Sequence, residues 1–445
     1  MRGERAVLLL IAFAFITSVS VSIAKAAPFE NDEAVYATQA RAWAASGPTT
    51  GILPHRAPLL PAIGTVLYRL GARAEWAYRL IGLVSGLAVL VLVWLLARDI
   101  AGPATGAIAA AVFASSPPFL LRSAQFMTDV PATAFLLATT LILWRNRERP
   151  TWTLLLAALF AAGAFYARYA SILPIGMLAV GAVVMWHRAL RSRPVVVGMT
   201  ILAFVVLLVP HIVHAIDVTG RPWGLITFTA SYASQAHFGQ GLRDYIFWLP
   251  FALAGPLAGI VMIGGIVTAI RHRSPVALFL VVIAIADILV IGATDHAEAR
   301  FVFFPVALLC IAGATAAARV RPVSIPAIAA TVALVGAGAF VVARTDGLRT
   351  AREAPRAVGR VVASLAGRPC TVLAVDVGPT TWYTGCSTYY FNDPATARAD
   401  VMVIYQAGGA ALSAQPDTLP LPPGQPIEIR DNGRELATIY PVIGR

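Results

Sequence analysis

The stretch that decides the fold begins at residue 6, where "AVLLLIAFAFITSVSVSIA" (6–24) is followed almost at once by "APFENDEAVYATQARAWAASG" (27–47). The first segment is long and apolar enough to cross a bilayer as a helix. The second places Glu30, Asp32 and Glu33 within four positions of one another. Because charged side chains are costly in hydrocarbon, we expect a membrane protein whose first loop is an acidic one beside the bilayer.

The rest of the chain repeats the pattern of long apolar runs. Of its 445 residues, 58% are hydrophobic and 13% are charged, and the mean hydropathy is +0.75. A soluble domain carries about 25% charged residues, so the composition indicates a polytopic membrane protein. The formal net charge of +12 comes from basic residues in small groups between the apolar runs. That distribution is typical of membrane-protein loops and argues against a nucleic-acid partner.

About eleven apolar segments are long enough, or nearly so, to span the membrane as helices. They fall at 6–24, 78–97, 104–121, 127–144, 151–167, 170–186, 195–214, 245–270, 275–293, 301–318 and 323–343. Only a tight turn at Arg168-Tyr169 separates the fifth from the sixth. The predicted fold class is therefore an α-helical polytopic membrane protein, with its transmembrane domain over residues 1–344.

The orientation follows from arginine, because short cytoplasmic loops carry the excess of basic residues. If the N-terminus is cytoplasmic, the inside loops contain Arg2, Arg5, Arg98, 145–149, 187–193, 271–273 and 319–321. The short outside loops then carry only isolated arginines, such as Arg122, Arg168 and Arg300. We expect a multi-pass protein of the cytoplasmic (inner) membrane, with residues 25–77 and 345–445 on the outer, periplasmic side.

The N-terminal segment can also be interpreted as a cleavable signal peptide, with Ala24-Lys25-Ala26 as the cleavage site. Its apolar run of about eighteen residues exceeds the roughly 7–15 of a usual signal sequence, which favours a retained helix. Both interpretations export Asp32 and Glu33, so the outer position of the acidic loop does not depend on the choice.

The C-terminal region, 345–445, has the mixed composition of a small α/β domain. The patterns predict an amphipathic helix over 348–367, strands over 371–377 and 399–406, and a hairpin over 427–443 that turns at 431–433. Cys370 and Cys386 lie in this region, in a compartment that permits disulfides, and are either bonded or free thiols. Cys310 lies within a span, where inert packing is expected.

The acidic pair of the first loop has two interpretations. In a helix that begins after Pro28, Asn31 or Asp32 serves as the N-cap, and acidic residues are stabilised by the positive end of the helix dipole. Asp32 and Glu33 are adjacent, however, and therefore project about 100° apart on a helix. We accordingly expect one of them to face a cleft and the other to cap or orient.

Further candidates lie on the predicted outer side. His55 and Arg56 follow a Gly/Pro-rich approach and are either interfacial anchors or phosphate ligands, a task that suits the fixed donors of arginine. Asp129 is either a helix cap or a site residue, and Asp287, within a span, is either functional or an interhelical contact. The remaining candidates are Arg122, Arg168, Tyr169, Asp295, His296, Glu298 and Arg300.

This constellation suits a substrate with an anionic head and an apolar tail. The arginines would hold a phosphate, the bilayer would hold the tail, and a carboxylate would activate an incoming hydroxyl. The seven histidines form no HExxH motif, so a zinc protease has no motif support.

Four stretches resemble the GT-C superfamily of glycosyltransferases that use polyprenyl-phosphate sugars, such as protein O-mannosyltransferases and lipid A aminoarabinose transferases. They are "NDEAVYATQARAW" (31–43), "HRAPLLPAI" (55–63), "MTDVPATAFLLA" (127–138) and "HAEARFVFFPVALL" (296–309). The resemblance implies that Asp32 is the catalytic carboxylate with Glu33 beside it, and that Arg56 and Asp129 contact substrate. Aminoarabinose transferases have lysine in place of Arg56, which puts substrate contacts there in doubt.

The resemblance implies an inverting hexosyl or pentosyl transfer at the outer face, to a glycolipid, a cell-envelope glycan or a protein. Asp32 would take the proton of the acceptor hydroxyl. Because the leaving phosphate is already an anion, arginines or a divalent cation suffice in place of a general acid. If the acceptor were itself a phosphate, Asp32 would instead hold a metal or orient the sugar.

Two other classes of protein compete with this interpretation. A transporter or lipid flippase would show inverted repeats and helices broken at the midplane, but no convincing repeat is present and the ionisable residues cluster on one side. A structural membrane protein with a periplasmic binding domain would leave the acids of the first loop unexplained.

Overall fold

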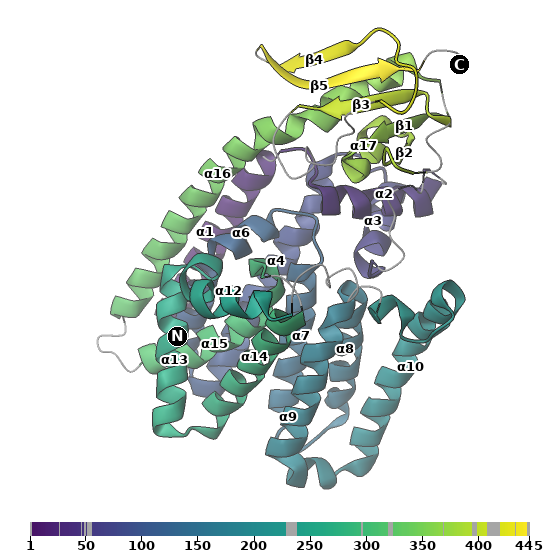
Figure 1. Ribbon diagram of the computed structural model, residues 1–445. Coiled ribbons are helices and arrows are strands. Elements are labelled where there is room, and N and C mark those ends of the chain that lie inside the picture. Colours follow the sequence, from purple (N-terminus) through teal and green to yellow (C-terminus); the bar gives the residue numbers. More distant parts are fainter. Residues whose placement is uncertain are drawn as a thin grey trace. The chain divides into compact units, whose positions relative to one another are not determined.

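The computed structural model describes residues 2–25, 27–45, 47, 48, 50, 56–227, 238–294, 297–318, 324–367, 369–393, 398–406, 419–431 and 433–442. Its contacts divide the chain into two compact units. The bundle unit comprises Met1–Val21, Pro54–Leu59 and Leu80–Val341, and the sheet unit comprises Ser22–Leu53, Leu60–Arg79 and Val342–Arg445. Within the described residues, the bundle unit consists of helices and the strands belong to the C-terminal part of the sheet unit (Figure 1).

Five of the described helices begin at a proline, whose fixed φ suits the first helical position. The helices lying wholly or partly in the bundle unit are α1 (Arg2–Ala24), α4 (Glu75–Ala101), α5 (Pro103–Ala114), α6 (Pro117–Ser123), α7 (Asp129–Arg145), α8 (Leu155–Ala167), α9 (Ile172–Arg191), α10 (Pro194–Thr219), α12 (Gln240–Trp248), α13 (Pro256–His272), α14 (Pro275–Thr294), α15 (Phe303–Ala317) and α16 (Ser324–Leu365). Short turns connect some of them, namely η1 (Trp152–Leu154), η2 (Tyr169–Ser171), η3 (Leu249–Leu253) and η4 (Ala299–Val302). The division between the units falls within α1, α4 and α16.

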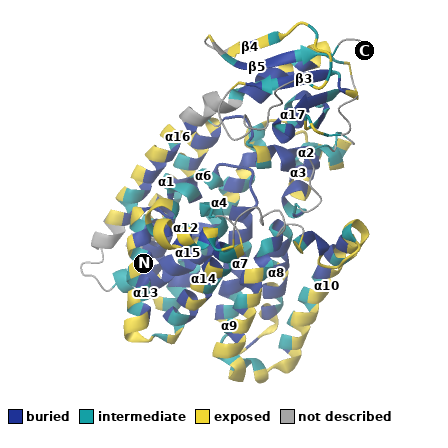
Figure 2. Cartoon of the chain, in the orientation of Figure 1, coloured by how far each residue is buried: buried dark blue, intermediate teal, exposed yellow. Residues whose placement is uncertain are grey.

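The chain is a multi-span helical membrane protein. Among the described residues, six helices are long and apolar enough to cross a membrane, or seven if α5 and α6, bent by 76°, form one span. Figure 2 colours much of α9 and α10 as exposed, and the exposed residues of α10 include Val195, Ile201, Val205, Val209 and Val213. Such a surface suits lipid rather than water. The predicted fold class is confirmed, whereas the number of eleven spans stays a prediction.

Helix α15 lies at the centre of the bundle unit, because every residue from Phe303 to Ala314 is buried. It crosses α13 at two glycines. A β-carbon at Gly265 would lie 2.5 Å from the backbone nitrogen of Gly313, and one at Gly313 would lie 2.1 Å from the carbonyl oxygen of Val261. Small residues that let helix backbones approach this closely are the usual packing device between helices in membranes.

The sheet unit contains a five-stranded sheet in the order β2-β1-β3-β5-β4. Its strands are β1 (Thr371–Ala374), β2 (Ser387–Tyr389), β3 (Val401–Tyr405), β4 (Ile427–Asp431) and β5 (Arg434–Pro441). Strand β1 pairs in parallel with β2 and β3, whereas β5 is antiparallel to β3 and β4. The predicted strands at 371–377 and 399–406 and the predicted hairpin are thereby confirmed.

Both faces of the sheet are covered. On one face Val372, Ala374, Val401 and Val403 form a core with residues of α16, and on the other Leu373 and Met402 form a second core. The alternation follows the period of two in a strand. The predicted helix over 348–367 exists, but it is the end of α16, which continues without a break from the last apolar segment.

The sheet unit also contains α2 (Asn31–Ala45), α3 (Leu59–Arg69, from Leu60 on) and α17 (Val377–Thr384). Helix α17 packs on α2 so closely that a β-carbon at Gly378 would lie 2.7 Å from Asn31 Oδ1. Arg41 of α2 donates hydrogen bonds to the carbonyls of Trp382 at 2.9 Å and Thr381 at 2.8 Å. The acidic first loop and the C-terminal region are therefore parts of one packed unit.

Cys370 and Cys386 form a disulfide with a sequence separation of 16 residues, which settles the alternative left open by the sequence. Each cysteine directly precedes a strand, β1 or β2. On the chain-entropy model, closing a loop of this size stabilises a fold by about 3 kcal/mol.

We expect the double variant Cys370→Ser, Cys386→Ser to lose about this amount of stability in the sheet unit. The measurement is limited proteolysis of the purified protein against temperature, following cleavage in residues 345–445. A reductant should lower the cleavage temperature of the wild type and leave the double variant unchanged. A wild type that is insensitive to reduction would contradict a stabilising role.

Candidate functional site

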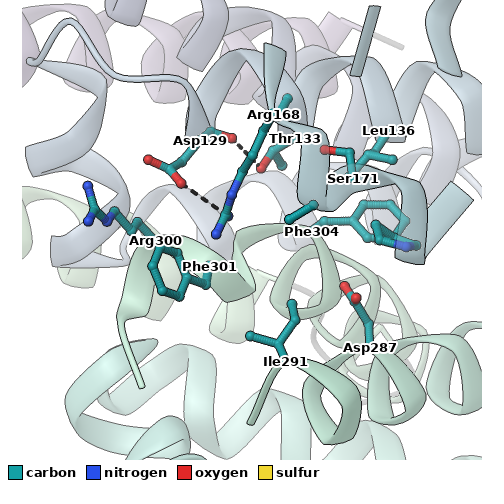
Figure 3. A pocket seen from close by; sticks show the side chains of 13 residues that line it. Asp129, Thr133, Leu136, Arg168, Ser171, Asp287, Ile291, Arg300, Phe301 and Phe304 are labelled. Carbon is teal, nitrogen blue, oxygen red and sulfur yellow. Dashed lines mark hydrogen bonds and ion pairs between the residues drawn. The ribbon is translucent and has the colours of Figure 1, made fainter. Parts of the chain in front are cut away.

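A pocket opens in the bundle unit between helices α7, α9 and α14, the start of α15 and the turns η2 and η4. Figure 3 shows the side chains that line it. Its charged lining residues are Asp129, Arg168, Asp287 and Arg300, and its aromatic ones are Phe301 and Phe304. Three of these charged residues were candidates for the outer site, and the structure brings them together although they lie up to about 170 positions apart in the sequence (129 to 300).

Arg168 reaches the pocket because the chain breaks between α8 and η2. Its backbone is extended, with φ −154° and ψ 116°, so the turn predicted at Arg168-Tyr169 is confirmed. The Arg168 Nη1 atom lies 3.1 Å from Asp129 Oδ1, and its guanidinium lies 4.2 Å from the centre of the Phe301 ring. Asp129 is the first residue of α7 and its side chain is only 3% exposed. A buried carboxylate and a cation–π contact thus hold the arginine in place.

A second pair of arginines shares one carboxylate. Arg300 Nη2 donates to Glu298 Oε1 at 3.0 Å, and Arg122 Nη2 lies 4.0 Å from Glu298 Oε2. The Glu298 backbone is fixed to α12, because Tyr245 donates to its carbonyl at 3.1 Å and accepts from its N–H at 3.2 Å. Among the described residues, this cluster thus places two guanidinium groups beside one carboxylate.

Asp32 and Glu33 lie in the sheet unit at the N-terminus of α2, and their environments differ. Glu33 is fully buried and receives two hydrogen bonds of 2.9 Å from Arg79, one to each oxygen. Its Oε2 also accepts the backbone N–H of Glu30 at 3.0 Å, as the glutamate of a capping box does. Asp32 is half-buried. The helix starts at Asn31, so Glu30 is the cap rather than Asn31 or Asp32.

A second carboxylate extends this network. Glu75 lies 3.8 Å from Arg79 Nη1 and accepts hydrogen bonds of 3.0 Å from Arg356 and of 2.7 Å from the Tyr383 hydroxyl. Burial, and then the negative charge of Glu75, raise the pKa of the Tyr383 phenol well above its ordinary value, so the phenol stays protonated and donates. The same hydroxyl accepts the Phe29 N–H at 2.8 Å. The segment that carries Asp32 is therefore tied to α4, α16 and α17.

The other candidate residues are placed as follows. Arg56 is half-buried just before α3. Tyr169 is buried in an aromatic cluster, with ring centres 5.1 Å from Phe165 and 4.6 Å from His211. His55, Asp295 and His296 lie outside the described residues. Within the described part of the chain, no three His, Cys, Asp or Glu side chains are grouped to hold a metal ion.

The sequence reasoning missed Glu75, Arg79, Arg356 and Tyr383. Glu75 and Arg79 stand four positions apart at the start of a span, an acid–base spacing that pairs on one helix face. That spacing was the available signal. Nothing local in the sequence indicates that Glu33 is the main partner of Arg79, because the two lie 46 positions apart.

A family model described as dolichyl-phosphate-mannose-protein mannosyltransferase matches residues 55–214. No curated protein sequence matches the chain.

Solved structures match over most of the chain. ArnT from Cupriavidus metallidurans bound to undecaprenyl phosphate is 16% identical, with a TM-score of 0.74 and 97% of both chains covered. The Archaeoglobus fulgidus oligosaccharyltransferase AglB in complex with an inhibitory peptide and a dolichol-phosphate is 12% identical, with a TM-score of 0.60 over 90% of this chain and 69% of that one. The chain therefore has the GT-C fold, and the predicted resemblance is confirmed.

Proposed function

We propose that this GT-C-fold protein transfers a sugar, with inversion, from a polyprenyl-phosphate donor to an acceptor on the outer face of the cytoplasmic membrane. The N-terminus is cytoplasmic and the sheet unit is periplasmic in this proposal. The acceptor is a glycolipid, a cell-envelope glycan or a protein. The observation that carries the proposal is the pocket with Arg168 and Arg300, in a fold whose solved examples include one bound to undecaprenyl phosphate.

The proposed roles follow from the surroundings of each residue. Arg168 and Arg300, with Arg122 behind Arg300, bind the phosphate of the donor and stabilise it as it leaves. Asp32 accepts the proton of the acceptor hydroxyl as that oxygen bonds to the anomeric carbon and the sugar–phosphate bond breaks. Glu33 is a positioning residue, because both of its oxygens already bind Arg79. His55, Arg56 and His296 remain proposed substrate contacts.

Membranes containing the protein test the proposal directly. They are supplied with radiolabelled undecaprenyl-phosphate monosaccharides of hexose, pentose and amino-sugar type, and transfer to lipid, glycan and protein fractions is counted. We expect transfer from at least one donor, absent from membranes without the protein. A protein that instead moves the intact lipid-linked sugar across the bilayer, without breaking the sugar–phosphate bond, would favour the flippase alternative.

Replacement of Arg168 by alanine should weaken donor use. A hydrogen bond to a charged group contributes about 1.5–3 kcal/mol, so kcat/KM for the donor is expected to fall about 10- to 100-fold. Arg168→Lys keeps the charge but loses the fork of donors, and should recover only part of the activity. Steady-state transfer kinetics in detergent measure both variants.

Arg147 offers a matched control at the other end of α7. It also pairs with a carboxylate, Glu148 at 2.8 Å, and stacks on a ring, that of Trp144 at 3.9 Å. Arg147→Ala should leave kcat/KM unchanged. Equal losses in Arg147→Ala and Arg168→Ala would argue against a phosphate-binding role for Arg168.

A further inference from the structure

Asp287 is the charged residue of the pocket that the proposed mechanism leaves unused. It lies in α14, within a span, and only 1% of its surface is exposed. Asp129, Arg300 and Glu298 are all paired with opposite charges, but Asp287 Oδ1 has no hydrogen-bond partner among the described residues. The sequence left two explanations for Asp287, a functional role or a contact between helices. Among the described residues, its Oδ1 atom makes no such interhelical hydrogen bond.

Leaving a buried carboxyl oxygen without a donor costs about 1–3 kcal/mol or more. Native proteins keep few such atoms, and ionisable groups inside a membrane usually serve function. Asp287 lines the pocket together with Ser171, Phe301 and Phe304. In Figure 3 its carboxyl group extends from α14 toward the space between Ser171 and Phe304, whereas Asp129 and Arg300 lie on the other side of the view. The carboxyl group with the unsatisfied oxygen therefore lines this pocket.

The chemistry of the lining selects which part of a ligand lies there. A carboxylate repels phosphate and accepts hydrogen bonds from hydroxyl groups, whereas Arg168 and Arg300 attract phosphate. Aromatic side chains such as Phe301 and Phe304 provide an apolar surface for the carbon-bound hydrogens of a sugar ring. A phosphate and a hydroxyl-bearing ring, joined in one molecule, therefore match the two ends of this pocket.

We infer that Asp287 binds the sugar of the lipid-linked donor, accepting hydrogen bonds from its ring hydroxyls while the arginines hold the phosphate. This inference rests on the proposed function. In it Asp287 is a specificity residue rather than the base, since Asp32 takes the proton. A donor whose sugar lacks a hydroxyl at the contacted position would leave the carboxyl unsatisfied, and a site of this kind discriminates strongly against such analogues.

The test separates sugar binding from phosphate binding in the intact protein. For wild type, Asp287→Asn and Asp287→Leu, KM is measured for the undecaprenyl-phosphate sugar that wild type uses fastest. Sugar-free undecaprenyl phosphate is then added as a product inhibitor, and its inhibition constant is determined. We expect KM for the sugar donor to rise about 10- to 100-fold in Asp287→Leu, and the inhibition constant of the sugar-free lipid to stay unchanged.

The unfolding temperature in detergent distinguishes a binding role of Asp287 from a structural one, because a purely structural role would lower it in the variants. Because Asp287 Oδ1 makes no hydrogen bond to the described residues, its replacement should leave the unfolding temperature unchanged or raise it. Leu289→Ala, two positions on in α14 at a side chain that is 46% exposed, is the control and should change neither constant.

An unchanged KM would overturn the inference, and so would equal weakening of both ligands. A lowered unfolding temperature with parallel losses would likewise assign Asp287 to the fold and overturn it. A wild type that transfers no sugar at all would instead remove the proposed function itself, so the two failures are distinguishable.

Discussion

Replacing Asp32 by asparagine is expected to lower kcat about 10²- to 10⁴-fold, the range typical of a lost general base. Asparagine has nearly the same shape but cannot take the proton of the acceptor hydroxyl. Transfer from the labelled donor that wild type uses measures the effect, with unfolding temperature measured alongside.

Glu30→Gln is the matched control for this prediction. It makes the same chemical change two positions earlier, just before α2, at a side chain that is half-buried, as that of Asp32 is. This variant should keep most of the activity. If Asp32→Asn keeps the wild-type kcat, Asp32 is not the general base. That result would favour an acceptor that is already ionised.

Replacing Arg79 by alanine is expected to destabilise the protein by about 3–5 kcal/mol, the cost of breaking a buried ion pair from one side. Glu33 would keep its charge at a fully buried position without the two hydrogen bonds from Arg79. Glu75 would lose a nearby positive charge at the same time. Thermal unfolding in detergent measures the loss, and a shift of many degrees is expected.

Two further variants give this prediction its controls. Arg98, at the other end of α4, pairs with Asp99 at 2.9 Å but has a side chain that is 36% exposed, so Arg98→Ala should cost no more than about 1 kcal/mol. The double variant Glu33→Leu, Arg79→Leu leaves neither of these two charges unpaired and should recover part of the loss. If Arg79→Ala unfolds at the temperature of Arg98→Ala, the buried pair contributes little.

Much of the fold follows from patterns that are local in the sequence. Apolar length predicts helices of the bundle, and alternation predicts β1, β3 and the β4–β5 hairpin. Helix α17 was missed because "VGPTTWYT" combines a proline, a glycine and three threonines, which all disfavour a helix. Its packing on α2 overrides that preference.

The site divides in the same way. Residue type and predicted side of the membrane identify Asp129, Arg168 and Arg300, which the structure brings to one pocket. The ion-pair partners of the two acids could not be predicted from the sequence. Nothing local indicates that Glu33 is buried and paired with Arg79 whereas Asp32 beside it is half-buried. The convergence of Asp32 with the arginines of the bundle unit stays a prediction.

Helices α13 and α15 cross at Gly265 and Gly313 with no room for a β-carbon, so their backbones are in close contact there. Helix α15 also supplies Phe304 to the pocket. If the donor sugar binds beside Phe304 as proposed, we expect sugars of different bulk to be discriminated there by the shape of this wall of the pocket. To broaden the range of sugars, Phe304 should be replaced by a smaller residue. Changes at the α13–α15 crossing would instead destabilise the buried helix at the centre of the bundle unit.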